Sequence, residues 1–441
     1  ALGRAQRRLA AVPASARAAA FVAALALLPV VVSSGYIIEV GVSALLMALL
    51  AMGLNLVAGW GGLLDLGYVA FYGFGAYLYA LLSSPQINVE LPGLLVMLIV
   101  LVASAALGCL VGLPSIRLAG DYLAIVTLFF GEAFVQVVNN VAPNVLGGPD
   151  GIPGANTIDL AGWHVVSVDD DYVLLLVLGS VVGAVLFNLN RSRLGRGWRA
   201  LREDGLAAEV MGVPVNRMKL LAFTIGAAVA GLTGTVFASV EYGAYPTSFN
   251  SQFLVMIYAA VVLGGTGSLT GVILGAGVVI VLPEVLRSPG AADILFYLLT
   301  VVGIVAWIRP LRRMLVILSA TLVIGFAARA VVAALRPHAL AGSAFFGPVG
   351  RAFVISFADP SGPGDVSFIA LVVAFVAVVQ LHGRRRDLLL PVVLYLAVFA
   401  WQNLLVQQPQ VTRELFLGVL LVAAMNLRPQ GLLGQTRVEV V

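Results

Sequence analysis

Apolar runs separated by short polar stretches follow one another along the whole chain. Each run is a candidate for a helix that crosses the roughly 30 Å hydrocarbon core of a bilayer. The fourteen runs lie at about 20–37, 40–58, 64–82, 92–113, 122–141, 172–190, 219–239, 252–264, 267–287, 293–308, 314–335, 366–382, 389–405 and 412–427. They lack the ten-residue alternating pattern of outer-membrane barrels. The pattern therefore predicts an all-α, polytopic integral membrane protein with about 10–14 transmembrane helices.

Composition agrees with a membrane protein. The chain is 61% hydrophobic and 10% charged, whereas soluble domains are roughly half apolar and a quarter charged. The net charge of +4 could suggest a nucleic-acid ligand. The arginines, however, form short clusters between apolar runs, as the positive-inside rule describes. They therefore indicate the orientation of the chain in the membrane. We expect no nucleic-acid partner.

The basic clusters predict a topology. We assume that the chain starts in the cytoplasm and that successive runs cross the membrane in alternate directions. All basic clusters then lie on the cytoplasmic side, namely those at 4–17, Arg117, 191–202, 309–313, 384–386 and Arg428. We therefore expect both termini and residues 191–218 in the cytoplasm, with 139–171 and 336–365 outside a bacterial cytoplasmic membrane. The N-terminal stretch is similar to a signal peptide but continues into the next run, so we expect an uncleaved first helix.

Two glycine-rich stretches, 59–78 and 263–279, share the pattern Gly-Gly-x-x-x-Leu. Paired interruptions of this kind in the two halves of a transporter often flank the substrate path, whereas simple close packing of helices is the alternative. The similarity favours an inverted repeat with broken or re-entrant helices. The candidate residues of a translocation path are Asn55, Gly61, Gly62, Asp65, Glu132, Gly264, Gly265 and Ser268.

Two of these candidates are carboxylates inside apolar runs. An ionisable group in hydrocarbon is costly, so Asp65 and Glu132 are functional candidates by default. Glu132 could line the path, carry protons or make a structural hydrogen bond to a neighbouring helix. The residues alone leave these roles open.

Catalytic chemistry has little support in the sequence. The three histidines lie in separate predicted loops without metal-ligand spacing, and Cys109 is the single cysteine. A P-loop needs Gly-x-x-x-x-Gly-Lys-Ser/Thr, but the single lysine, Lys219, is followed by Leu220. We therefore expect no catalytic residue, metal or cofactor on this chain, and any ATP and Mg²⁺ on separate subunits.

A charged, helix-forming segment at 199–212 interrupts the apolar pattern. Asp204 or Gly205 could cap a new helix, and Gly212 followed by Pro214 could end it. Such a segment could be a solvated loop or a helix on the membrane surface. Its mixed charges and small side chains fit a groove on another protein at least as well. The candidate docking residues are Arg202, Glu203, Asp204, Leu206, Ala207, Ala208, Met211 and Gly212.

This segment also carries a family resemblance. The stretch ALREDGLAAEVMGVPVNRMKLLAFTIGA (200–227) resembles the coupling loop of ATP-binding-cassette (ABC) importer permeases, specifically the LivM-type subunit of branched-chain amino-acid importers. Matching stretches in the same order are 53–82, 113–140, GGPDGI (147–152), LGGTGSLTGVILGA (263–276) and RPQGLLG (428–434). The resemblance implies a LivH-type permease partner, two cytoplasmic ATPase subunits and an extracytoplasmic binding protein.

The resemblance covers about 40–290 and 412–434. It divides the chain into a basic N-terminus at 1–19, a permease core at 20–290, additional helices at 291–411 and a last helix with the C-terminus at 412–441. The additional helices depart from the family pattern and are expected to pack outside the pore. Gly205 also departs, since the family more often has an acidic residue there.

Three other functions stay open at this point. A closely similar permease could carry urea or short amides. A proton-coupled secondary transporter could use Glu132 or Asp65 but would not need the loop at 199–217. A non-transporting scaffold would leave the paired glycine-rich stretches unexplained.

Overall fold

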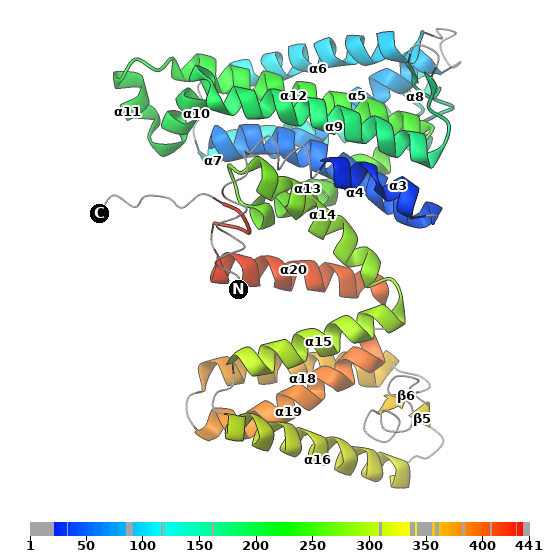
Figure 1. Ribbon diagram of the computed structural model, residues 1–441, viewed down its shortest axis with the longest axis vertical. Helices are drawn as coiled ribbons and strands as arrows, with labels where there is room; N and C mark the ends of the chain where they lie inside the picture. Colours follow the sequence, from blue (N-terminus) through cyan, green and yellow to red (C-terminus); the bar gives the residue numbers. More distant parts are fainter. Residues whose placement is uncertain are drawn as a thin grey trace. The chain divides into compact units, whose positions relative to one another are not determined.

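A computed structural model shows two compact units, one of residues Ala1–Val281 with Leu421–Val441 and one of Leu282–Leu420. It describes residues 22–32, 34–84, 91–115, 118, 120–160, 163–307, 311–335, 340–341, 355–357, 361–381, 384–405, 408–428 and 430–434. Nearly all of these residues are helical, which confirms the all-α fold class (Figure 1).

The first unit contains most of the long helices. In chain order its elements are α3 (Leu28–Val31), α4 (Gly35–Leu54), the π-helix η1 (Asn55–Trp60), α5 (Tyr68–Ser83), α6 (Gly93–Ser115), α7 (Asp121–Asn140), α8 (Pro143–Leu146), η3 (Gly148–Asp150), α9 (Val168–Arg191), α10 (Arg193–Glu203), α11 (Gly205–Val210), α12 (Val215–Val240), η4 (Pro246–Phe249), α13 (Ser251–Gly264) and α14 (Leu269–Val285). Two antiparallel strand pairs accompany them: β1 (Ile152–Pro153) with β4 (Gly243–Ala244), and β2 (Asp159–Leu160) with β3 (Trp163–His164).

Each predicted apolar run coincides with helical residues, but not every helix has the length of a span. Within the described residues, seven helices are long and apolar enough to cross a membrane. They are Gly35–Trp60, Gly93–Pro114, Asp121–Asn140, Val168–Arg191, Val215–Val240, Arg312–Leu335 and Arg385–Leu405. The predicted run 20–37 is divided, since one helix ends at Val31 and α4 begins at Gly35. The glycine-rich stretches shorten their neighbours, α5 and α13.

Helix α12 forms the centre of the first unit and packs against α4, α5 and α6 (Figure 1). Small residues permit this close packing. A Cβ atom on Gly234 would collide with the main-chain oxygen of Tyr72, and one on Gly231 would collide with Ser104 Oγ. Glycine at such contacts lets helix backbones approach in a membrane, where burial of apolar surface does not drive association.

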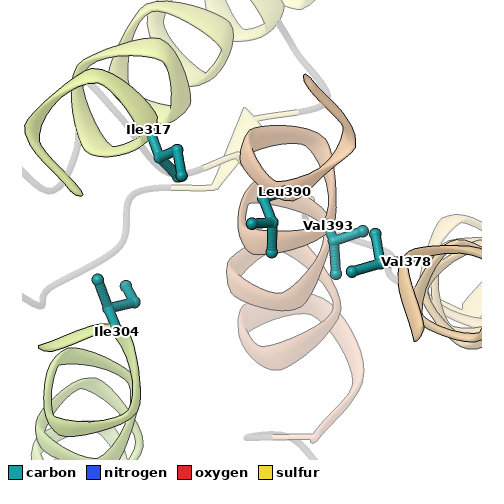
Figure 2. Close-up of a cluster of buried hydrophobic side chains, with 5 residues drawn as sticks. All are labelled: Ile304, Ile317, Val378, Leu390 and Val393. Atoms are coloured by element: carbon teal, nitrogen blue, oxygen red, sulfur yellow. The ribbon is translucent and has the colours of Figure 1, made fainter. Parts of the chain in front are cut away.

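The second unit consists of α15 (Pro289–Trp307), α16 (Leu311–Leu335), α18 (Ser361–Gln380), α19 (Arg384–Ala400), the π-helix η6 (Trp401–Leu405) and most of α20 (Pro409–Leu427), with the strand pair β5 (Leu340–Ala341) and β6 (Ser356–Phe357). Figure 2 shows one of its buried apolar clusters, which joins side chains of four helices: Ile304, Ile317, Val378, Leu390 and Val393.

A buried carboxylate holds another part of the second unit together. Asp293 Oδ1 accepts hydrogen bonds from Trp401 Nε1 at 2.7 Å and from Gln402 Nε2 at 2.9 Å. The Trp401 ring stacks on Phe296 with centroids 4.4 Å apart. Both donors belong to η6, where π-helical geometry widens the turn. Pairing satisfies the polar groups in an otherwise apolar environment.

Candidate functional site

The two glycine-rich stretches meet inside the first unit. Helix α4 continues into the π-helical turn η1, which begins at the buried residue Asn55. Asn55 Oδ1 accepts a hydrogen bond of 2.7 Å from the main-chain nitrogen of Gly267, 212 positions later. A π-helical turn re-aims side chains and is frequent at functional sites. Here it joins one interrupted stretch to the other.

Two further features hold this contact. Trp60 Nε1 donates a 2.9 Å hydrogen bond to the main-chain oxygen of Gly267. Gly59 lies so close that an added Cβ would collide with Asn55 Oδ1 and lie 2.8 Å from the nitrogen of Gly267. A side chain at this position is therefore incompatible with the observed packing. We call Asn55, Gly59, Trp60, Thr266 and Gly267 the glycine junction.

Arg202 connects α10 to both sides of the glycine junction. Its Nη1 donates a 2.6 Å hydrogen bond to the main-chain oxygen of Gly59, and its Nη2 donates one of 3.2 Å to Thr266 Oγ1. The planar guanidinium can make both contacts at once, whereas an ammonium group cannot reproduce that fork. The charged segment is thus fastened to both helix interruptions.

The fold of α10 places Arg202. Ser192 caps the helix by accepting a hydrogen bond from the nitrogen of Leu194. The helix buries one face, formed by Gly195, Trp198 and Leu201 at helical spacing. The Trp198 ring stacks against Trp60 with centroids 6.4 Å apart, and its Nε1 donates to the main-chain oxygen of Met218. Apolar packing and the Arg202 hydrogen bonds therefore fix α10 on the junction.

Asp204 ends this helix and starts the next. It has an extended conformation, and its Oδ1 accepts hydrogen bonds from the nitrogens of Leu206 and Ala207 at the start of α11. Gly212, with φ of +83°, follows the end of α11 in a conformation that favours glycine. The prediction of a cap at Asp204 is confirmed. The prediction of one helix over 199–212 is wrong, because the cap divides it.

The structure revises the roles predicted for two docking residues. Arg202 points to the glycine junction and not to the rim of an outer contact. Ala208 is 4% exposed and faces the chain itself, so it does not belong to the exposed surface of α11. Glu203, Ala207 and Gly212 are exposed.

An exposed apolar patch lies on α11 and on Met211, the residue that directly follows it. Leu206, Val210 and Met211 are 79%, 87% and 82% exposed, respectively. Leu206 and Met211 were predicted, whereas Val210 was not. Helical spacing could have found it, since residues 206 and 210 are four apart and share a helix face. Three large apolar side chains thus lie exposed close together in the sequence, which is the kind of patch that often marks an interaction site.

The second glycine-rich stretch forms a tight turn between α13 and α14. A Cβ on Gly264 would collide with the main-chain oxygen of Gly271, which explains the need for glycine there. Ser268 Oγ accepts a 3.1 Å hydrogen bond from the nitrogen of Gly271 and caps α14. Gly265, with φ of +107°, touches the main chain of Gln430 and Gly434.

The C-terminal RPQGLLG segment therefore contacts the same turn. The nitrogen of Leu432 donates to the main-chain oxygen of Leu263 at 2.9 Å, and the nitrogen of Leu433 donates to that of Gly264 at 3.1 Å. Residues far apart in the sequence thus hold the turn between α13 and α14.

The first break, between η1 and α5, contains three more predicted residues. Gly61 is buried, and Gly62, with φ of +67°, lies against the Arg202 side chain. Asp65 is 1% exposed, and its Oδ1 accepts a hydrogen bond from the nitrogen of Gly67 at 3.0 Å. The main-chain oxygen of Asp65 accepts from Tyr258 Oη at 2.7 Å, which connects the break to α13.

Glu132 lies apart from this group. It is exposed on α7, a helix of span length, and makes no hydrogen bond to another described residue. No group of three His, Cys, Asp or Glu side chains that could hold a metal occurs in the described ranges.

The described contacts connect an exposed patch to two helix interruptions. The cap at Asp204 joins α11 to α10, and Arg202 joins α10 to the glycine junction. Packed helices and hydrogen bonds of this kind carry coupling between sites.

The chain is similar in sequence to known permease proteins. The chain is 39% identical over 289 residues to the high-affinity branched-chain amino acid transport system permease protein LivM of Salmonella typhimurium strain LT2. The matched region covers 59% of this chain and 65% of that protein. Identity to LivM of Escherichia coli K12 is 38% with the same coverage. The match thus spans less than two thirds of the length of these relatives.

A shorter match reaches a different permease protein, LivH of Escherichia coli K12, with 32% identity over 116 residues, 26% of this chain and 37% of that protein. No solved structure matches the chain. Residues 36–308, more than half of the chain, match the family described as branched-chain amino acid transport system / permease component. That range includes both glycine-rich stretches and the α10–α11 segment, and the chain therefore belongs to this family of permease components.

Proposed function

We propose that the chain is the LivM-type permease subunit of an ABC importer that carries branched-chain amino acids across the bacterial cytoplasmic membrane. The observation that carries the proposal is the Arg202 connection from the α10–α11 segment to both glycine-rich breaks. A permease driven by a separate motor needs such a path from its docking surface to its membrane helices. The names of the matched relatives support the substrate class.

The proposed motor is a pair of cytoplasmic ATPase subunits, which bind ATP and Mg²⁺. One of them contacts the exposed patch of Leu206, Val210 and Met211 on α11. Methionine adapts to irregular apolar surfaces, and apolar anchors at the centre of a contact contribute most of its binding energy. The exposed charges of Glu203 and Glu209 border the patch and set its register.

A LivH-type permease subunit completes the proposed pore, and an extracytoplasmic binding protein delivers the substrate. Exposure of Glu132 within a membrane-length helix supports the permease partner. A carboxylate facing lipid would be costly, whereas a partner helix or the path between two subunits can solvate or pair it. Helix α7 therefore faces the partner subunit in this proposal.

The proposed path passes the glycine junction and the break at 61–67. Asn55, Gly61, Gly62, Gly264, Gly265 and Ser268 shape the main chain around it, and buried Asp65 supports the break without lining an open surface. Discontinuous helices near a substrate site are a common device of transporters. The substrate class is set chiefly by the binding protein, so urea and short amides are tested alongside leucine.

Reconstitution tests the proposal. The chain is co-expressed with candidate LivH-type and ATPase partners and placed in proteoliposomes with a candidate binding protein. We expect ATPase co-purification and uptake of labelled leucine, isoleucine or valine that requires internal ATP. Uptake driven by a pH gradient without ATPase subunits would instead establish a secondary transporter, and uptake of urea alone would replace the substrate class.

A variant pair locates the motor contact. Met211→Asp places a charge in the exposed patch and should reduce ATPase co-purification and uptake at least about tenfold, because an apolar anchor becomes a desolvated charge. Asn216→Asp is the matched control, since Asn216 is exposed outside the patch. If both variants lose ATPase co-purification and uptake equally, or if neither variant loses them, the patch is not the docking surface.

A further inference from the structure

A cavity in the second unit lies between the first turns of α16 and α19. Its volume is about 320 Å³, and it is lined by Arg312, Arg313, Val316, Ile317, Asp387 and Leu388. Both helices are of membrane-spanning length and composition, and the spans begin at Arg312 and Arg385. Because the spans start at the cavity, its mouth lies at the depth of lipid headgroups.

The mouth of the cavity carries an excess of positive charge. The lining contains two cationic residues, Arg312 and Arg313, and one acidic residue, Asp387. Arg313 Nε lies 3.7 Å from Asp387 Oδ2, which is a long ion pair with the arginine side chain 62% exposed. Cations in a first turn also oppose the helix dipole, so an anion placed there interacts favourably with both helices.

The wall below the mouth is apolar. Val316 and Leu388 are 65% and 69% exposed, while Ile317 at the base is 3% exposed. Ile317 belongs to the buried cluster of Figure 2, which shows it on α16 beside Leu390 of α19. The cavity therefore has a cationic rim above an apolar surface, an arrangement that suits an amphipathic anion.

We propose that this cavity binds one anionic phospholipid, with its phosphate at Arg312 and Arg313 and an acyl chain along Val316 and Leu388. Basic pockets between membrane helices bind anionic headgroups in this way. Arginine forms forked hydrogen bonds to phosphate oxygens. An anionic phospholipid is favoured over a zwitterionic one, because the ammonium group of a zwitterionic headgroup would lie near the arginines. Free phosphate shares the charge but makes no use of the apolar wall.

The full-length chain in nanodiscs of equal phosphatidylglycerol and phosphatidylcholine tests this proposal. After release of the protein, native mass spectrometry counts the retained lipids of each kind. We expect preferential retention of phosphatidylglycerol, with occupancy lowered about tenfold in Arg312→Gln/Arg313→Gln, since each cation near the headgroup contributes to binding. Arg287→Gln is the control, because Arg287 is exposed in the same unit and pairs with Glu284 outside the cavity.

Two further measurements keep the test decisive. Asp387→Asn removes the competing carboxylate and should raise phosphatidylglycerol retention even if the double variant folds poorly. Inorganic phosphate at millimolar concentration should not displace the lipid, whereas displacement would indicate a free-anion site and overturn the lipid assignment. Equal retention of both lipids, or equal loss in Arg287→Gln, would also overturn it.

Discussion

Arg202 Nη1 donates a 2.6 Å hydrogen bond to the main-chain oxygen of Gly59, a residue 143 positions earlier in the chain. The same guanidinium reaches Thr266 Oγ1 of the second glycine-rich stretch. One side chain on the proposed docking segment therefore touches both helix interruptions. This relationship turns a general resemblance into a specific mechanical hypothesis, in which Arg202 positions the junction relative to the motor contact.

Replacement of Arg202 tests that hypothesis. Arg202→Gln removes both charge-assisted hydrogen bonds, so we expect at least about tenfold lower substrate uptake with ATPase binding retained, because the exposed patch of α11 is unchanged. Arg202→Lys keeps the positive charge and should recover uptake only in part, because one ammonium group cannot make the forked pair of hydrogen bonds. The measurement is uptake per ATP hydrolysed in proteoliposomes.

Arg199→Gln is the matched control for Arg202. Arg199 lies on the same helix, but its hydrogen bonds go to the main-chain oxygens of Gly195 and Asn190 within the α9–α10 region. Its loss should leave the uptake-to-hydrolysis ratio near that of the wild type. If both variants lower this ratio equally, Arg202 has no special connection to the junction.

The packing at Gly59 makes a second prediction. Gly59→Ala would push Asn55 and Gly267 apart and break their 2.7 Å hydrogen bond. Overpacking and the loss of a buried hydrogen bond each destabilise by about 1–3 kcal/mol. We expect a lower thermal unfolding midpoint and loss of uptake. Gly277→Ala is the control, because no atom lies within 4 Å of its added Cβ.

Topology is testable by labelling. In a Cys109→Ala background, a cysteine in place of exposed Arg193 should react with membrane-impermeant maleimide from the cytoplasmic side, and one in place of exposed Asn144 from the outer side. The reason is the position of the basic clusters, which stay on the cytoplasmic side. Labelling of both positions from one side of sealed vesicles would contradict the predicted orientation.

Much of the fold follows from local signals in the sequence. The apolar runs locate the helices, and the Asp204 side chain stops one helix and starts another through its own hydrogen bonds. The contact between Asn55 and Gly267 could not be read in this way, because it depends on a π-helical turn and on residues 212 positions apart. Glycine spacing indicated where the stretches are, but not that they meet.

The candidate site shows the same limit. The mixed charges and small side chains of the segment put Arg202 and Ala208 on a predicted docking surface. The division of that segment at Asp204 changes which side chains face outward, and tertiary contacts with the glycine junction draw Arg202 inward. Amphipathic patterns identify a surface only when the helix that carries it is unbroken.

Ala208 therefore separates folding of the segment from docking. Ala208→Glu would place a carboxylate at a position that is 4% exposed, and an unpaired buried charge costs about 3–5 kcal/mol. We expect α11 to detach from the chain, which would make the main chain at half-buried Arg202 accessible to trypsin and raise the cleavage rate there even without partner subunits. Ala207→Glu, at the exposed neighbouring position, should leave that rate unchanged. Met211→Asp should also leave it unchanged while lowering ATPase binding. Slow, wild-type cleavage of Ala208→Glu would mean that α11 does not depend on burial of this residue, and the Arg202 path would then begin at α10.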